Sequence, residues 1–376
     1  MCRSVTEKII PWRNILLISE VIFWTNLWCM FEMPMTARTL EAANWACEEI
    51  AMNRFAAVVL AAIVAAIGAA PSDAQVMMGA HVGNEDDPNP QGEFVAFETQ
   101  IGRQLAIDSD YSVWPAFPNT QRIKWDMRNG RTPMQSWLVL YDISNPDVCA
   151  TAAAISGGVY DVQLAKQAAA VKALGGTVLV RFAYEMTGNK ETTCFTGFPV
   201  LNNPAQAGQI YVAAWRHIVG LFRAAGATNV KWVWGPGWYA FTKNIWNYFY
   251  PGPGYVDWIS VDYYNLANTP AAWTADPGIL DFDAAIAPLG KPMMIAENAA
   301  FDDPAQSPDP QTLWLQTARP WLKAHPEITA YVYWDSAAQN PPPPPYSGTG
   351  YYLAGPGLAA FTAMANDPYF MAPPLK

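Results

Sequence analysis

The chain has 376 residues, of which 52% are hydrophobic and 14% charged, and its formal net charge is −10. A chain of this kind can form one large domain or two smaller ones around a full core. Its acidic balance, without a cluster of Lys or Arg, argues against binding to nucleic acid or to an anionic membrane surface. The 17 Trp, 17 Tyr and 16 Phe could serve both a core and a sugar-binding surface.

The first 74 residues resemble a targeting segment rather than part of a fold. Met52–Arg54 is a short basic start, and an Ala-rich apolar stretch with small residues after it follows. We therefore predict a signal peptide over residues 52–74, with a mature protein that begins at Gln75; the alternative is a membrane anchor that is retained. Residues 1–51 would precede the signal peptide, so we expect an over-extended start site. The mature protein is then expected to be secreted or periplasmic, without stable membrane association.

The cysteines and histidines bear on redox state and on metals. Cys149 and Cys194 are the only cysteines after the predicted signal peptide. In an exported protein this favours one disulfide, with two buried free thiols as the alternative. The three histidines (His81, His217 and His325) are too scattered for a zinc site, so we expect no metal and no other cofactor.

From residue 75 onward, apolar runs of strand length alternate with segments of helical period, which predicts a parallel sheet. No Gly-rich phosphate loop supports the alternative of a doubly wound sheet. The predicted strands are Val76–Val82, Gln104–Ile107, Gln135–Tyr141, Thr177–Phe182, Val230–Trp234, Trp258–Val261, Pro292–Ala296 and Thr329–Tyr333. The clearest helices are Asp161–Leu174, Ala205–Ala225, Ala271–Leu289 and Gln311–Ala324. Eight such units over residues 75–376 match a single-domain (β/α)8 TIM barrel. We also expect the protein to be a monomer.

Two glutamates end predicted strands. Glu185 closes the run from Thr177, and Glu297 closes the run from Lys291. Burying a carboxylate is costly without partners, and the chemistry of a barrel lies at the C-terminal ends of its strands. Two carboxylates placed there can act as the acid and the nucleophile of a retaining glycosidase. A structural ion pair is the alternative for each. Asp108 and Asp110 after the second predicted strand are expected to be turn residues rather than part of a cleft.

The ordered motifs around these glutamates resemble glycoside hydrolase family 26, the β-mannanase family. The likeness extends over most of the chain from Met78 to Trp334. Its motifs are the segments 94–114, 179–188 (Leu-Val-Arg-Phe-Ala-Tyr-Glu-Met-Thr-Gly), 211–234, 250–264 and 291–297. The resemblance implies a (β/α)8 barrel that cleaves β-linked polysaccharides with retention of anomeric configuration.

The resemblance also implies roles by position. Glu185 would be the general acid/base and Glu297 the nucleophile. Arg181 would orient both carboxylates, Tyr264 would donate a hydrogen bond to the nucleophile, and Trp334 would form a sugar platform. The other expected substrate contacts are Tyr184, Trp234 and Asp262. For Trp234 and Trp334, a place in the core is the alternative.

Three residues near Glu185 depart from the family pattern. Tyr184 stands where the family has His, Thr187 where it often has Asn, and Lys190 where an aromatic residue often follows. These changes affect the sugar contacts nearest to cleavage more than the reaction itself. We expect an endo-acting hydrolase of β-mannan, β-glucan, β-xylan or a bacterial exopolysaccharide. The alternative is a catalytically silent glycan-binding barrel in polysaccharide assembly.

Overall fold

The computed structural model describes the part of the chain that was predicted to form the barrel. The described residues are 75–376 apart from 84–87, 140–148, 189, 268, 338–347 and 349. The predicted leader (1–51) and signal peptide (52–74) lie outside the described residues. Among the helices of the described part, none has both the length and the apolar character needed to cross a membrane.

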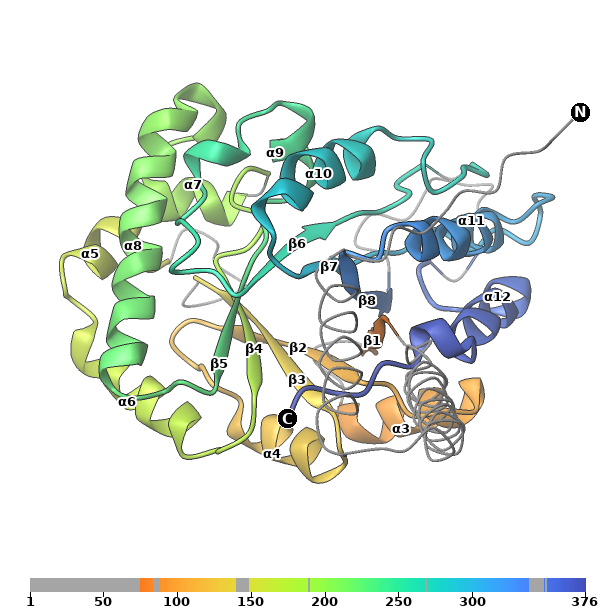
Figure 1. The fold of residues 1–376 in the computed structure, drawn as a ribbon, viewed down its shortest axis with the longest axis horizontal. Helices are drawn as coiled ribbons and strands as arrows, with labels where there is room; N and C mark the ends of the chain where they lie inside the picture. The colour runs from red at the N-terminus through yellow and green to blue at the C-terminus, as the bar shows by residue number, and fades with distance from the viewer. Residues whose placement is uncertain are drawn as a thin grey trace, which may run out of the picture. The chain divides into compact units, whose positions relative to one another are not determined.

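Eight parallel strands close into a barrel in the order of the sequence, with β8 paired to β1. The predicted (β/α)8 fold is therefore confirmed (Figure 1). Because all strands run the same way, their C-terminal ends meet at one end of the barrel, the C-terminal rim. The strands are β1 (Met77–Val82), β2 (Ile107–Val113), β3 (Thr132–Leu138), β4 (Val178–Phe182), β5 (Val230–Trp234), β6 (Trp258–Asp262), β7 (Met293–Glu297) and β8 (Ile328–Asp335).

Helices follow the strands and surround the barrel (Figure 1). They are α3 (Pro90–Ile101), α4 (Thr120–Arg128), α5 (Ala152–Ser156), α6 (Asp161–Lys172), α7 (Lys190–Thr196), α8 (Pro204–Ala224), α9 (Trp238–Thr242), α10 (Gly278–Ile286), α11 (Pro310–Ala324) and α12 (Gly355–Ala365). All four predicted helical segments contain a helix, in α6, α8, α10 and α11. Several further helices were not predicted from the sequence pattern.

Three of these helices begin with the same chemical signal. In α3, α8 and α11, an Asn or Asp precedes a Pro at the first helical position. The side-chain oxygen of Asn89, Asn203 and Asp309 accepts a hydrogen bond from the N–H three residues ahead, at 3.2, 3.2 and 2.8 Å. The cap satisfies a free N–H, and the proline has none to satisfy, so each helix starts where the sequence dictates.

The side chains of each strand alternate between the barrel interior and the surrounding helices. On β4, Leu179 belongs to the small apolar cluster inside the barrel, and Val180 belongs to the large cluster under the helices. The next inward position is Arg181. The interior therefore changes from apolar to charged over two residues, at the C-terminal rim.

The second strand was predicted wrongly. It was expected at Gln104–Ile107, but the chain pairs from Ile107 to Val113. Asp108 and Asp110 therefore lie within β2 and are not turn residues. Burial does not need an apolar side chain here, because Asp108 is fully paired with Arg122, with its oxygens 2.6 and 3.0 Å from the guanidinium nitrogens.

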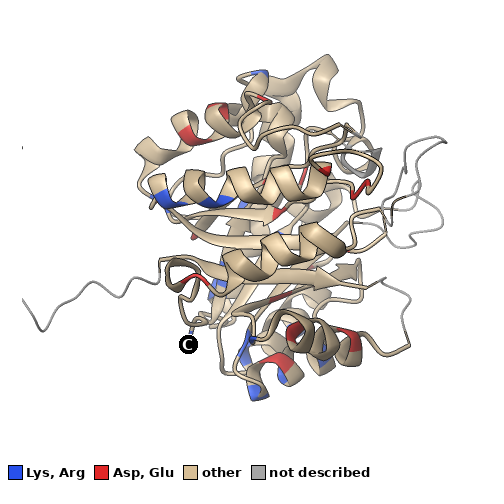
Figure 2. Cartoon of the chain, turned by 90° about the vertical axis from the view of Figure 1, so that its right-hand side faces the viewer, with Lys and Arg blue, Asp and Glu red and all other residues tan. Residues whose placement is uncertain are grey.

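A disulfide joins Cys149 to Cys194, as predicted, with their Cα atoms 6.2 Å apart. It ties the segment before α5 to α7, and so links the connections that follow β3 and β4. The charged positions in the view of Figure 2 are few and scattered, in keeping with the low charged fraction of the chain.

Candidate active site

A buried arginine organises the C-terminal rim. Arg181 ends the inward face of β4 and is fully buried. Its Nη2 donates to both oxygens of Asp262 at 2.7 and 2.6 Å, and its Nη1 donates to Glu297 Oε1 at 2.7 Å and to Ser136 Oγ at 3.0 Å. Asp262 and Glu297 are register partners on β6 and β7.

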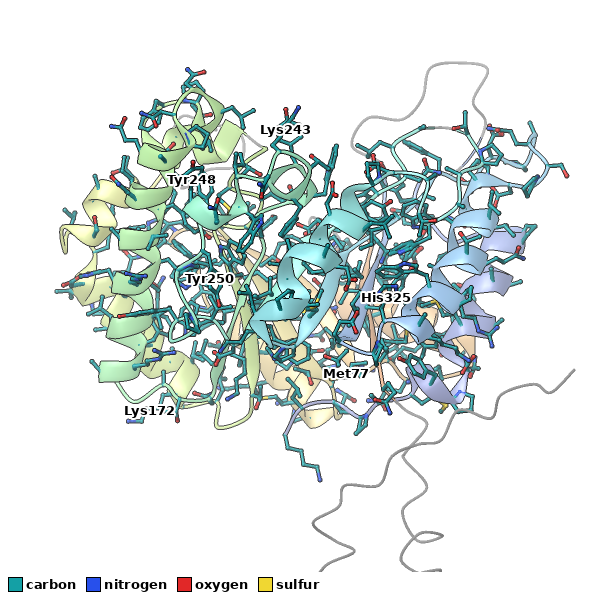
Figure 3. The ribbon with its side chains drawn as sticks, turned by 45° about the horizontal axis from the view of Figure 1, so that its top comes forward. Met77, Lys172, Lys243, Tyr248, Tyr250 and His325 are labelled. Atoms are coloured by element: carbon teal, nitrogen blue, oxygen red, sulfur yellow. A yellow bond between two sulfur atoms is a disulfide. The ribbon has the colours of Figure 1, made fainter. Side chains whose placement is uncertain are left out.

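Figure 3 marks the two ends of the barrel, with Lys243 beyond β5 at one and Met77 at the other.

Glu297 receives two further hydrogen bonds from neutral donors. Tyr111 Oη donates to Oε1 at 2.6 Å, and Tyr264 Oη donates to Oε2 at 2.9 Å. Burial and the charge of Glu297 raise the pKa of both phenols well above the ordinary value. The two tyrosines therefore stay protonated at neutral pH and donate to Glu297. Hydrogen-bond donors and positive charge of this kind favour the ionised form of a carboxyl group.

Glu185 lies on a backbone turn just beyond β4. Its φ is +51°, and that of Ala183 is +44°, values uncommon for residues other than Gly. The turn is fixed by Ala183 N donating to Trp137 O and by Glu185 N donating to Gly235 O, at 3.0 and 2.8 Å. Such conformations persist where the surrounding structure enforces them, often at functional sites.

The two glutamates influence the same neighbours. Burial raises the pKa of Tyr184 and Tyr264 well above the ordinary value, and the charges of both Glu297 and Glu185 add to that rise. Burial also raises the pKa of Asp262, and the charges of Glu297 and Glu185 add to that rise. The two carboxylates thus lie at one place on the rim, with Glu297 buried and Glu185 partly exposed.

Aromatic rings line the rim beside Glu297. Trp334 is partly exposed and stacks on His81 at 4.2 Å between ring centroids, and Tyr111 meets both rings edge-on. His81 Nδ1 lies 3.0 Å from the carbonyl oxygen of Ser109, and burial lowers the pKa of the ring. His81 is therefore neutral, with Nδ1–H as the donor. Its buried ring packs against one face of Trp334 and holds that side chain in place.

The centroid of the Tyr184 ring lies 4.5 Å from Cζ of the Arg181 guanidinium. The side chain is partly exposed, and its ring also approaches Tyr111 edge-on. Tyr184 thus places an aromatic face and a hydroxyl next to Glu185 in the chain.

Seven of the eight residues predicted for the site lie together here, and Trp234 does not. It is fully buried in the cluster under the helices and packs edge-on against Tyr250. The period of two places Val233 inside the barrel and so turns Trp232 and Trp234 outward. Without exposed surface Trp234 cannot stack on a sugar, so its prediction as a substrate contact is wrong.

Tyr111, His81 and Ser136 are site residues that the sequence did not reveal. Tyr111 was missed because β2 was predicted to end at Ile107. Its alternation with Ile107 and Ser109 on one face of the strand was the available signal. His81 was considered only as a zinc ligand.

Comparison with known proteins places this geometry in context. No family model matches the chain. Endoglucanase H of Acetivibrio thermocellus is 30% identical over 236 residues, which are 60% of this chain; the chain spans about a quarter (24%) of that relative's length. The mannanase man26 of Bacillus subtilis matches with a TM-score of 0.53 and 18% identity, covering 78% of this chain and 86% of that one. The GH26 β-mannanase BoMan26A of Bacteroides ovatus matches with a TM-score of 0.53 and 17% identity, covering 78% and 89%.

The fold and the rim define a (β/α)8 barrel protein with a carboxylate pair at the ends of β4 and β7. Solved structures of mannanases, one of them named a GH26 enzyme, share this fold over most of the chain, as the predicted resemblance to glycoside hydrolase family 26 implied for the fold.

Proposed function

We propose that the chain is a retaining glycoside hydrolase that cleaves a β-linked polysaccharide, with Glu185 as general acid/base and Glu297 as nucleophile. The observation that carries the proposal is the hydrogen bonding of Glu297. One guanidinium nitrogen and two phenols hold its ionised form at the barrel rim, beside a second glutamate on a constrained turn.

The first step joins the sugar to Glu297. Its Oε1 already accepts two short hydrogen bonds and Oε2 only one, so Oε2 is the better nucleophile. Oε2 attacks the anomeric carbon while the bond to the glycosidic oxygen breaks. Glu185 gives its proton to that oxygen, and the shortened chain leaves as an alcohol.

The second step releases the sugar. The ionised Glu185 takes a proton from water, and the water oxygen attacks the anomeric carbon as its bond to Oε2 breaks. Two inversions give net retention. Trp334, held by His81, offers a ring face to the sugar at the reacting centre.

Several β-glycans remain as substrates. The relatives are named an endoglucanase and mannanases, and Tyr184 alters the contacts beside Glu185. We therefore propose an endo-acting enzyme for β-glucan, β-mannan, β-xylan or a bacterial exopolysaccharide, secreted or periplasmic. The disulfide between Cys149 and Cys194 supports an oxidising compartment.

The test has two stages. The purified chain is assayed on the four glycans, and the anomer of the first-formed product is read by proton NMR, with the β form expected. Glu185→Ala and Glu297→Ala are then assayed on an aryl β-glycoside with a good leaving group and with added azide.

The two variants should give opposite products. In Glu185→Ala the sugar still reaches Glu297, and azide should release a β-glycosyl azide. In Glu297→Ala azide replaces the nucleophile directly and should give the α product. Wild-type activity in either variant would refute the assignment. Sugar binding without turnover on every substrate would favour the alternative, a catalytically silent glycan-binding barrel.

A further inference from the structure

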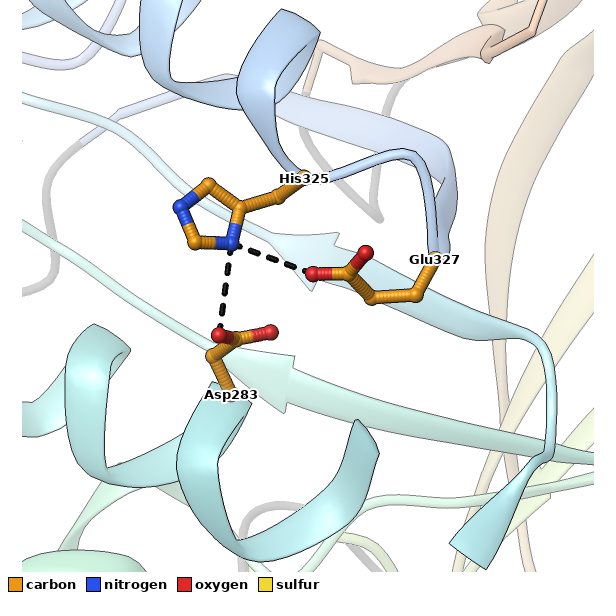
Figure 4. Close-up of side chains that lie close together, drawn as sticks. All are labelled: Asp283, His325 and Glu327. Carbon is orange, nitrogen blue, oxygen red and sulfur yellow. Dashed lines mark hydrogen bonds and ion pairs between the residues drawn. The ribbon is translucent and has the colours of Figure 1, made fainter. Parts of the chain in front are cut away.

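We propose that Asp283, His325 and Glu327 form a binding site for a divalent metal ion of the zinc type, at the opposite end of the barrel from the candidate active site. His325 follows the last residue of α11, Glu327 precedes β8, and Asp283 lies on α10. One ligand atom from each residue lies within 4.8 Å of the others, and the three side chains point toward one another (Figure 4).

The donor geometry fits a coordination shell. His325 Nδ1 lies 3.2 Å from Asp283 Oδ2 and 3.1 Å from Glu327 Oε1. Zinc bonds to imidazole nitrogen and carboxylate oxygen measure about 2.0–2.2 Å, which gives neighbouring ligands about 3.0 Å apart in an octahedron and about 3.4 Å apart in a tetrahedron. The observed separations lie between these values.

Hydrogen bonding satisfies these groups only in part, although the side chains of Asp283 and Glu327 interact through a hydrogen bond. A neutral imidazole carries one N–H, and here two carboxylates face the same nitrogen. Within the described part of the chain, Asp283 Oδ1 is buried and accepts no hydrogen bond. No Lys or Arg of the described chain forms an ion pair with Asp283 or Glu327. A divalent cation would bond to all three donors and balance both negative charges.

The positions of the ligands are fixed by the fold. The His325 ring stacks on Trp321 at 3.9 Å. The backbone of Glu327 is tied to β7, because Met293 N donates to its carbonyl oxygen at 3.1 Å. An imidazole with two carboxylates suits Zn²⁺ or Mn²⁺ better than Ca²⁺, which takes only oxygen ligands. A bound ion would join α10 and α11 to the start of β8, where barrels concentrate stability rather than catalysis.

The experiment measures Zn²⁺ binding by the full chain after treatment with a chelator and its removal. His325→Phe keeps the ring that stacks on Trp321 but removes the donor. The matched control is His217→Phe. Among the described residues His217 pairs only with Asp161, at 2.7 Å, and so lacks the second carboxylate.

Bound Zn²⁺ per chain is measured by equilibrium dialysis with metal analysis. Wild type and His217→Phe should each bind one more Zn²⁺ per chain than His325→Phe does. At about 100-fold excess over the dissociation constant, their Tm should rise by a few degrees. Glu327→Gln should weaken binding at least about tenfold. The comparison with His325→Phe separates this site from any zinc held by cysteine thiolates. Equal binding and equal Tm shifts in wild type and His325→Phe would overturn the proposal and leave the cluster an ion pair.

Discussion

Two clusters of buried charge among the described residues are paired differently. The rim cluster comprises Tyr111, Arg181, Asp262, Tyr264 and Glu297, with Glu185 beside it. The helix-side cluster, between β2, α3 and α4, comprises Glu98, Asp108, Arg122, Asp126 and Arg131.

In the helix-side cluster, each arginine grips its own carboxylate with two nitrogens. Arg122 holds Asp108, and Arg131 holds Glu98. The rings of Phe94 and Trp125 cover both guanidinium groups. Such closed pairs leave no oxygen for a substrate.

In the rim cluster, Arg181 divides its nitrogens between two carboxylates. Asp262 receives Nη2 on both oxygens, whereas Glu297 receives only Nη1 on one oxygen and completes its shell with phenols. Glu297 therefore keeps one oxygen, Oε2, whose donor in the described structure is a neutral phenol. Under the proposed function, this contrast predicts that a buried acid is reactive where its arginine is shared and neutral donors complete the shell.

The largest difference in activity between the two clusters is expected when their arginines are replaced. Arg181→Lys should lower kcat/KM by roughly 10²–10³-fold, because Lys cannot hold both carboxylates in their present geometry. Arg122→Lys should lower stability by about 1–3 kcal/mol, from the loss of a buried charged hydrogen bond, and leave kcat/KM of the folded enzyme within about twofold of wild type. Kinetics and thermal unfolding on both variants test this. Equal loss of activity in Arg122→Lys while it stays folded would erase the distinction between the clusters.

Removal of a phenol hydroxyl from the rim cluster should lower activity by a smaller factor. Tyr111→Phe or Tyr264→Phe should lower kcat about tenfold, since each removes one donor to Glu297, and a hydrogen bond to a charged group contributes about 1.5–3 kcal/mol. The acidic limb of the pH–activity profile should move to higher pH, because the ionised form loses support.

Tyr263 supplies the control for the phenols. It neighbours Tyr264, but its hydroxyl donates to the carbonyl oxygens of Trp273 and Asp276, away from the rim. Tyr263→Phe should lower Tm and leave the pH–activity profile in place. An unmoved acidic limb in both Tyr111→Phe and Tyr264→Phe would show that the phenols do not act on Glu297.

The sequence predicted those parts of this arrangement that depend on local pattern. The apolar runs ending in Arg181, Glu185 and Glu297 placed the barrel and most of the rim. Tyr111 was missed because its contact with Glu297 spans 186 residues and its strand is half polar. Trp234 was assigned to the wrong side of its strand although the predicted bounds, Val230–Trp234, are those observed. Apolar residues occupy both faces of this strand, so the sequence pattern does not show which face points into the barrel.

The smallest effect on activity is expected for the surplus acid of the helix-side cluster, where three carboxylates meet two arginines. Burial raises the pKa of Asp126 to about 11, and the nearby Asp108 adds to the rise. Asp126 is therefore protonated in the folded protein at pH 7 but ionised in the unfolded chain, whose Asp titrates near about 3.9. Between those values the folded state binds one more proton, so this residue makes stability fall as pH rises, by at most about 1.4 kcal/mol per pH unit.

Asp126→Asn removes this pH dependence, because the amide stays neutral in both states. In urea unfolding at pH 5 to 8, the variant should gain on wild type as pH rises, by up to about 4 kcal/mol over the three pH units. Its kcat/KM should not change, since Asp126 lies outside the rim cluster. A matched Asp110→Asn variant, on the neighbouring β2, controls for a general loss of negative charge. A stability difference between Asp126→Asn and wild type that stays constant from pH 5 to 8 would mean that Asp126 is ionised in the folded protein. The helix-side cluster would then hold three ionised carboxylates against two arginines, with one negative charge unbalanced. A shared arginine would therefore no longer be the feature that separates the rim cluster from the helix-side cluster.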